Sequence, residues 1–252
     1  MNLLTVDLGN SRSKLRAWSA EGGGAPRLAG EADLPSETGI GGGIAAWLAG
    51  RPVQSAAVCS VVGAALELEV AEALRRSIDG PVDLAPDAGL SIACREPTLV
   101  GRDRLLGARA ALELARGDAL VVSLGTALTV DAVRADRTFL GGAIAPGPEL
   151  LARALALGTA RLPALAPIAG VPALGLDTPG ALRAGIAVGL RGAARELGER
   201  VAAEAGLENA TVVLTGGSRH FLLDPPVFSA ARLRVERDLV HLGLLAARGK
   251  GR

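Results

Sequence analysis

Two stretches of the chain, Val6–Ser11 and Val122–Ala127, have similar sequences. In each copy an apolar run ends in a small polar residue, which is followed by a leucine, a glycine and a polar side chain. A strand that ends in this way presents backbone N–H groups and a polar side chain to a phosphate. The copies are separated by about one domain's length of chain. The repeat therefore predicts two similar lobes that bind one nucleotide between them.

The composition narrows the classes of partner. The chain has 252 residues, enough for one large domain or two of ordinary size, and its core must be aliphatic because it has three Phe, two Trp and no Tyr. Its 27 basic and 26 acidic residues give a net charge of +1. This balance argues against nucleic acid and anionic membranes as partners. No apolar run reaches the roughly 20 residues that span a bilayer, and no signal segment is expected. We expect a cytoplasmic protein with two reduced cysteines.

The order of apolar runs and helical patterns predicts a duplicated α/β fold with mixed sheets. Strands are expected at 2–8, 14–18, 27–32, 55–62, 82–84, 119–124, 128–133, 138–144 and 211–214. Helices are expected at 44–49, 66–78, 101–115, 148–157, 178–205, 218–223 and 235–247. The series strand–strand–strand–helix–strand–helix begins again after residue 115. Two domains, 1–115 and 116–252, are therefore predicted.

The first glycine turn contains residues suited to a nucleotide. Asp7 at a strand end suits a magnesium ion, Gly9 lets the backbone approach a phosphate, Asn10 and Ser11 can donate hydrogen bonds, and Lys14 supplies a positive charge. Taken alone, the segment is equally a hairpin with a polar tip. The second Gly-Thr turn, together with the Thr-Gly-Gly turn at 215–217, favours phosphate binding.

A second polar cluster, Gly101-Arg102-Asp103-Arg104, stands where a helix is expected to begin. A carboxylate between two guanidinium groups stays ionised and can accept a proton from an alcohol that attacks a phosphoryl group. An arginine beside it can bind a carboxylate through two hydrogen bonds. From the spacing alone, a helix N-terminus with a surface ion pair is the favoured interpretation.

Other polar residues give weaker signals. Thr178 before Pro179 is typical of a helix N-cap, and its hydroxyl could also face a substrate. His220 and His241 have no partner at catalytic spacing and are expected to be solvated or structural. Asp131, at alternating spacing in a strand, is either catalytic or merely exposed.

Together these motifs resemble type III pantothenate kinases, in the same order and over nearly the whole chain. The resemblance rests on residues 7–14, 60–62, 101–104, 125–131, 141–147, 159–163, 178 with 185, 214–217 and 239–244. It implies the actin-like ATPase superfold, in which two ribonuclease-H-like lobes hold ATP in a cleft between them. It also implies ATP-dependent phosphorylation of pantothenate to 4′-phosphopantothenate, the first step of coenzyme A synthesis. A homodimer, a divalent ion and a monovalent cation, potassium or ammonium, complete what the family implies.

The resemblance also implies roles for individual residues. Asp103 would accept the proton of the pantothenate hydroxyl, and Asp7 would lie near magnesium, directly or through water. The residues that would bind ATP are Asp7, Leu8, Gly9, Asn10, Ser11, Arg12, Ser13, Lys14, Gly125 and Thr126. The residues that would contact pantothenate are Gly101, Arg102, Asp103, Arg104, Thr178 and the residue at the position of Cys94.

Three positions depart from the family pattern. Ser123 stands where the family has the carboxylate that ligates the monovalent cation, Cys94 replaces a tyrosine, and Gly107 replaces an asparagine. A neutral hydroxyl contributes only a dipole, so the requirement for the cation is expected to be weakened. Two alternatives stay open: an ATP-binding paralogue with a regulatory instead of a catalytic role, and a kinase for another small alcohol.

Overall fold

The computed structural model describes residues 2–20 and 24–248, which form two compact units. The described part of the first unit comprises 2–90, 98–110 and 239–248, and the second unit comprises 91–97 and 111–238. The chain therefore passes between the two units four times, and its last helix belongs to the first unit. No helix of the described residues is both long and apolar enough to cross a membrane.

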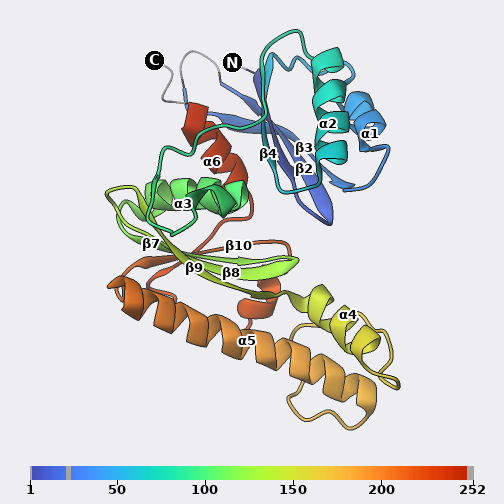
Figure 1. Ribbon diagram of the computed structural model, residues 1–252, viewed down its shortest axis with the longest axis vertical. Helices are drawn as coiled ribbons and strands as arrows, with labels where there is room; N and C mark the ends of the chain where they lie inside the picture. The colour runs from blue at the N-terminus through green and yellow to red at the C-terminus, as the bar shows by residue number, and fades with distance from the viewer. Residues whose placement is uncertain (1, 21–23, 249–252) are drawn as a thin grey trace. The chain divides into compact units, whose positions relative to one another are not determined.

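The first unit is built on a five-stranded mixed sheet (Figure 1). Its strands are β1 (Asn2–Leu8), β2 (Arg12–Ser19), β3 (Arg27–Pro35), β4 (Ser55–Ser60) and β5 (Val82–Asp83), in the spatial order β3-β2-β1-β4-β5. Strand β1 pairs antiparallel with β2 and parallel with β4. Asp7 of β1 is therefore opposite Lys14 on one side and opposite Cys59 on the other.

The second unit repeats this topology. Its strands are β6 (Ser91–Ile92), β7 (Ala119–Leu124), β8 (Ala127–Val133), β9 (Thr138–Pro146), β10 (Thr211–Thr215) and β11 (Leu233–Val235). Their order is β11-β10-β7-β8-β9-β6, with β7, β8 and β9 antiparallel and β10 parallel to β7. Apart from the added β6, this is the arrangement of the first sheet, so the predicted duplicated α/β fold with two mixed sheets is confirmed.

Helices cover the faces of the sheets because strand alternation separates two sets of side chains. The helices are α1 (Ile40–Leu48), α2 (Ala64–Ser77), α3 (Arg102–Ala115), α4 (Pro148–Gly158), α5 (Thr178–Ala205) and α6 (Leu239–Arg248). On β1, Leu4, Val6 and Leu8 pack with α1 and α2 in one core. The alternate residues Thr5 and Asp7 lie on the opposite face. In the second unit α5 covers the face formed by β7, β8 and β10.

Most predicted elements are present with ends shifted by a few residues, and the differences are local. The expected helix at 235–247 begins at Leu239, because Val235 belongs to β11, which pairs with β10. The expected helix at 218–223 is a 3-10 turn at Arg219–Leu222. Two strands, β6 and β11, were not predicted, since they are only two and three residues long. The two domains 1–115 and 116–252 stay a prediction. The two compact units group residues by their contacts, whereas the predicted domains follow the repeat in the sequence.

Within the first unit, α6 packs directly on the backbone of α3. A methyl group on residue 243 would lie 2.1 Å from the carbonyl oxygen of Leu106, so only the glycine at this position allows the approach. The helix α6 also packs against β1 and β4, and Arg248 at its end donates a hydrogen bond to Ser55 Oγ at 2.8 Å. Leu106 and Leu244 share a buried cluster with Leu3 of β1. Helix α6 therefore fixes the start of α3 relative to the first sheet.

A polar cluster lies inside this contact. His241 of α6 is buried, and its Nδ1 lies 2.8 Å from Thr5 Oγ1, which also accepts a hydrogen bond from Trp18 Nε1 at 2.7 Å. His241 Nε2 is buried and has no hydrogen-bond partner in the described structure. Burial, together with the nearby charges of Arg16 and Lys14, lowers the pKa of His241 well below its ordinary value. The expectation of a structural histidine is met, and the ring is neutral.

This burial makes stability depend on pH. In the unfolded chain His241 binds a proton below its ordinary pKa of 6.5, whereas in the folded chain it stays neutral. Its contribution to the free energy of unfolding is therefore complete above pH 6.5 and is lost as the pH falls below it. The loss is about 1.4 kcal/mol for each pH unit until the folded-state pKa is reached.

We expect His241→Leu to weaken the fall in stability below pH 6.5, because the group that takes up the proton on unfolding is gone. Urea unfolding of wild type and variant, above pH 6.5 and about one unit below it, measures the difference. His220→Gln, at an exposed histidine, is the control and should keep the wild-type pH dependence. Equal pH slopes in His241→Leu and wild type would contradict the expectation.

Candidate functional site

The first glycine turn joins β1 to β2 and presents Asp7 beside Lys14. The two residues are cross-strand neighbours, with Lys14 Nζ 3.7 Å from Asp7 Oδ2, and the Asp7 side chain is only 13% exposed. The turn is closed by a hydrogen bond from Gly9 N to the carbonyl oxygen of Arg12 at 3.2 Å. Asn10, Ser11 and Arg12 are exposed. The turn is therefore open to a ligand at its tip and holds an anion–cation pair at its base.

Asp103 lies in the first turn of α3, as the sequence predicts. A methyl group on residue 101 would come within 2.6 Å of Asp103 Oδ1, so Gly101 makes the room for this carboxylate. Burial raises the pKa of the Asp103 carboxyl, while the backbone N–H and the guanidinium of Arg104 oppose the rise. A half-buried carboxylate with a raised pKa at the start of a helix is suited to accepting a proton.

Asp7 and Asp103 lie close enough for their charges to interact. Burial raises the pKa of Asp7, Lys14 lowers it, and the charge of Asp103 raises it further. The buried thiol of Cys59, opposite Asp7 in the sheet, has its pKa raised by burial and by both carboxylates. The two partly buried carboxylates repel one another. A cation held between these carboxylates and a bound ligand would reduce the repulsion.

Magnesium fits these residues. It binds proteins through one or two carboxylates and completes its shell with water and phosphate oxygens, so it needs no cage of side chains. Among residues 2–20 and 24–248 no group of three or more His, Cys, Asp or Glu could hold a metal ion. Asp7, directly or through water, is the residue that would hold magnesium together with a nucleotide.

The other predicted residues of the first unit take different positions. Leu8 is in the core, and Ser13 is buried with its hydroxyl 2.7 Å from Ser36 Oγ. These two side chains therefore belong to the scaffold of the turn. Arg102 is exposed and donates a hydrogen bond to the carbonyl oxygen of Leu84 at 3.0 Å. Gly107 is buried on α3, and a methyl group on this residue would lie 3.7 Å from the Leu239 side chain.

The second glycine turn, between β7 and β8, is held by close backbone contacts. Methyl groups on residues 147 and 216 would lie 2.1 Å from Gly125 O and 2.2 Å from Leu124 O. Gly147 N donates to Thr126 O, and Ser218 N donates to Leu124 O, each at 2.9 Å. Thr126 is exposed at the tip. The Thr-Gly-Gly segment thus lies directly against the Gly-Thr turn, and glycines at both contacts make this possible.

Ser123, at the end of β7, stands between two threonines. It is directly opposite Thr129 of β8 and Thr215 of β10. The three hydroxyls are neutral, and the next acidic residue along β8, Asp131, is buried and engaged by another group. This donor set does not fit the monovalent cation that the family resemblance implies, because it offers no charge to offset dehydration of the ion.

Thr178 begins α5, but it is not the N-cap. Asp177 has the N-cap position, and its carboxylate accepts a hydrogen bond from Gly180 N at 2.6 Å. The expected cap is therefore wrong by one residue, since a carboxylate accepts this bond as well as a hydroxyl does. The hydroxyl of Thr178 is left free of the capping role.

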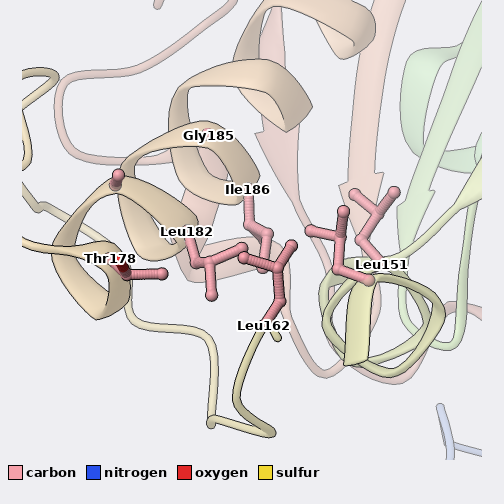
Figure 2. A pocket seen from close by; sticks show the side chains of 8 residues that line it. Leu151, Leu162, Thr178, Leu182, Gly185 and Ile186 are labelled. Atoms are coloured by element: carbon pink, nitrogen blue, oxygen red, sulfur yellow. The ribbon is translucent and has the colours of Figure 1, made fainter. Parts of the chain in front are cut away.

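Thr178 instead lines an apolar pocket of about 380 Å³ between α4 and α5 (Figure 2). The remaining lining residues are small or aliphatic: Leu151, Leu155, Leu162, Ala181, Leu182, Gly185 and Ile186. Thr178 is thus the polar side chain at the edge of an apolar surface.

Cys94 follows β6 and is half-buried. Its Sγ lies 3.3 Å from the position of a methyl group on residue 141, a glycine whose positive φ of 106° few other residues adopt. Cys94 therefore packs beside a position of β9 that requires glycine, in the second unit.

Some residues around these turns have no counterpart in the sequence-based prediction. Thr129 and Thr215 flank Ser123, and Gly147 and Gly216 press the turns together. The spacing of Ser123 and Thr129 around a short turn could have placed them opposite one another. The contact of Gly216 with Leu124 carries no local signal, because it joins segments about ninety residues apart.

Comparisons with known proteins identify a family. The family model for type III pantothenate kinase matches residues 3–200. A type III pantothenate kinase from Chromobacterium violaceum is 35% identical over 246 residues, covering 96% of this chain and 97% of that protein. One from Halorhodospira halophila is 38% identical over 229 residues, with 85% and 86% covered.

A solved structure agrees in fold. The crystal structure of a conserved Baf family protein from Campylobacter jejuni is 19% identical and covers 98% of both chains with a TM-score of 0.63. This likeness, together with the duplicated sheets, shows that the two proteins share a fold. The match over most of its length shows that this chain belongs to the type III pantothenate kinase family.

Proposed function

We propose that the chain catalyses the ATP-dependent phosphorylation of pantothenate to 4′-phosphopantothenate, the first step of coenzyme A synthesis. The family membership supports the reaction. The observation that carries the proposal is the proximity of Asp103 to Asp7 within the first unit, one carboxylate at a helix start and the other paired with Lys14. Phosphoryl transfer to an alcohol needs one base for the alcohol and positive charge for the phosphates.

In the proposed reaction Asp103 accepts the proton of the primary hydroxyl of pantothenate. The hydroxyl oxygen forms a bond to the γ-phosphorus of ATP, the bond from that phosphorus to the β,γ-bridging oxygen breaks, and ADP leaves. Gly101 keeps the Asp103 carboxylate in place, and Arg102 and Arg104 supply charge for the carboxylate of pantothenate. Lys14 faces the phosphates from β2.

The roles of the remaining site residues are part of the same proposal. The exposed turn residues Asn10, Ser11 and Arg12 bind phosphate oxygens on the first unit, supported from behind by Leu8, Gly9 and Ser13. We assign Gly125 and Thr126 to the binding of ATP, and Thr178 and Cys94 to the binding of pantothenate.

ATP and magnesium are the cofactors in this proposal. Magnesium, held near Asp7 when bound, would neutralise the charge of the phosphates. The potassium or ammonium ion that the family resemblance implies is left out, because Ser123, Thr129 and Thr215 offer it no charged ligand. Pantothenate is the partner, and the cytoplasm is the proposed location because ATP is the co-substrate.

The activity itself is tested by incubating the purified protein with ATP, magnesium and pantothenate. We expect phosphopantothenate, identified by mass spectrometry. Absence of product in potassium, ammonium and sodium salts alike would overturn the proposal. Comparing pantothenate with other small alcohols in the same assay tests the substrate.

Asp103→Asn should lower kcat about 10²–10⁴-fold, the usual contribution of a general base, because an amide cannot accept the proton. The affinity for a non-hydrolysable ATP analogue, measured by calorimetry, should change little. Asp79→Asn, at an exposed aspartate of the same unit, is the matched control and should leave kcat unchanged. Unimpaired turnover in Asp103→Asn would remove this residue from the mechanism.

The raised pKa of Asp103 predicts an acid limb in the pH profile of kcat/KM. The base works only when ionised, so the rate should fall as the pH drops through a pKa that lies above the ordinary 3.8. Circular dichroism at each pH separates this loss from unfolding. A profile that stays flat down to about pH 4 while the protein stays folded would contradict the assignment.

We also propose that the protein is a homodimer joined through the surface of α4, α5 and the segment between them. Large apolar side chains are exposed there, among them Leu157, Leu174 and Leu176, the last 93% exposed. The apolar pocket beside Thr178 is part of the same surface. Contiguous exposed apolar surface is typical of protein interfaces.

Leu174→Asp combined with Leu176→Asp should convert the dimer to a monomer, because burying two carboxylates in an apolar interface is costly. Light scattering during gel filtration should give twice the chain mass of 25.4 kDa for wild type and the chain mass for the variant. Leu99→Asp, at a 75% exposed leucine of the first unit, is the control and should remain dimeric. A monomeric wild type would refute the dimer.

A further inference from the structure

We propose that the second glycine turn of this chain works without a bound monovalent cation, and that a row of three hydroxyls, Thr215, Ser123 and Thr129, donates hydrogen bonds to the nucleotide there. The inference rests on the proposed kinase function and concerns how this chain performs it. It separates this chain from the cation-dependent pattern that the family resemblance implies.

The three residues form a straight row across the sheet. Thr215 of β10 is directly opposite Ser123 of β7, which is directly opposite Thr129 of β8. Residues opposite one another on neighbouring strands project from the same face. The alternate residues of β7 and β8 lie in the core that packs against α5, so the hydroxyls project from the other face.

The hydroxyls are close to the turn and available. Thr215 is 7% exposed, and Ser123 and Thr129 are half-buried. In the part of the chain that the structure describes, none of the three side chains hydrogen-bonds to another protein group. Two polar residues nearby, Thr126 and Asp131, do have further interactions. Each hydroxyl therefore retains its O–H donor for a ligand.

The geometry of the row is wrong for a single cation. Neighbouring strands are about 4.8 Å apart, so the outer strands β10 and β8 are about 10 Å apart. Opposite ligands of a hard cation lie only about 5 Å apart. The side chains of Thr215 and Thr129 are too short to close that gap around one ion.

Three backbone carbonyls of the turn are already directed at N–H groups and not at a common point. An alkali ion that sheds its water needs several carbonyl oxygens aimed at one point. Here the carbonyl oxygens of Leu124, Thr126 and Ala127 accept hydrogen bonds from Ser218, Gly147 and Gly125. Asp131, the next acidic residue along β8 from Thr129, is buried and already engaged. Neutral donors in a line suit the oxygens of a phosphate chain, which is itself extended and anionic.

The first measurement is the kinase rate in potassium chloride and in tetramethylammonium chloride at equal ionic strength. We expect equal rates for wild type. Ser123→Asp, which restores a carboxylate at this position, should become faster in potassium. A wild-type rate at least about fivefold higher in potassium, the lower end of ordinary coupling between ligands, would overturn the inference.

The second measurement is independent of turnover. Calorimetry compares the affinity of the protein for a non-hydrolysable ATP analogue with magnesium in the two salts. We expect equal affinities, whereas a coupled cation would change them about 5–150-fold. Ser123→Ala and Thr129→Val should each weaken analogue binding, since each removes one O–H donor. Potassium-dependent affinity, or unchanged binding in both variants, would overturn the inference.

A third measurement needs no nucleotide. Thallium(I), a potassium substitute visible by NMR, should show no saturable binding to wild type. Saturable binding that Ser123→Ala removes would place a cation at this turn and overturn the inference. Absence of product in every salt would refute the kinase proposal, yet the calorimetric and thallium results would still decide the cation question. If Ser123→Asp does not fold, the wild-type measurements decide it alone.

Discussion

The contact between the backbones of α3 and α6 determines where the chemistry of the first unit can take place. Gly243 lies so close to the Leu106 carbonyl that no other residue fits, and α6 in turn packs on β1 and β4. Asp103 begins the same α3, and Asp7 ends the same β1. A methyl group at residue 243 would push the two elements apart and with them the two carboxylates. The electrostatic coupling of Asp7 and Asp103 thus depends on a hydrogen atom in place of a side chain.

The duplication supplies the same topology twice but different chemistry at its two glycine turns. At the first turn a carboxylate faces a lysine across the strand pair, and a second carboxylate approaches from a helix. At the second turn three hydroxyls stand side by side and the backbone is compressed by two glycines. One turn is therefore charged and the other neutral.

Much of the fold could be predicted from the sequence, because long strands and helices leave a periodic signal. The similar sequences of Val6–Ser11 and Val122–Ala127 predicted the duplication, and α5 was expected with its observed bounds. Short edge strands such as β6 and β11 were missed because two or three residues carry no period. Asp177 was missed as the N-cap because Thr178 next to it is as good a cap by type.

The site divides along the same line. Asp7, Lys14 and Asp103 belong to local motifs and could be predicted. The other residues of the candidate site are brought together by contacts between distant segments. The row of Ser123, Thr129 and Thr215 needs the pairing of β7 with β10, and the neutral state of His241 needs α6 placed on Thr5. Such pairings depend on tertiary packing, which no window of sequence contains.

The return of α6 to the first unit has a consequence for the order of folding during synthesis. The first unit's own strands emerge from the ribosome early, yet the helix that covers Thr5 and supports α3 is made only after residues 111–238. At ordinary rates of translation this takes on the order of ten seconds. Until then the cluster around Leu3 and Trp18 lacks Leu244 and its neighbours on α6. The nascent chain therefore carries an incompletely covered apolar surface for as long as the second unit is being made, and surfaces of this kind are the ones that chaperones bind.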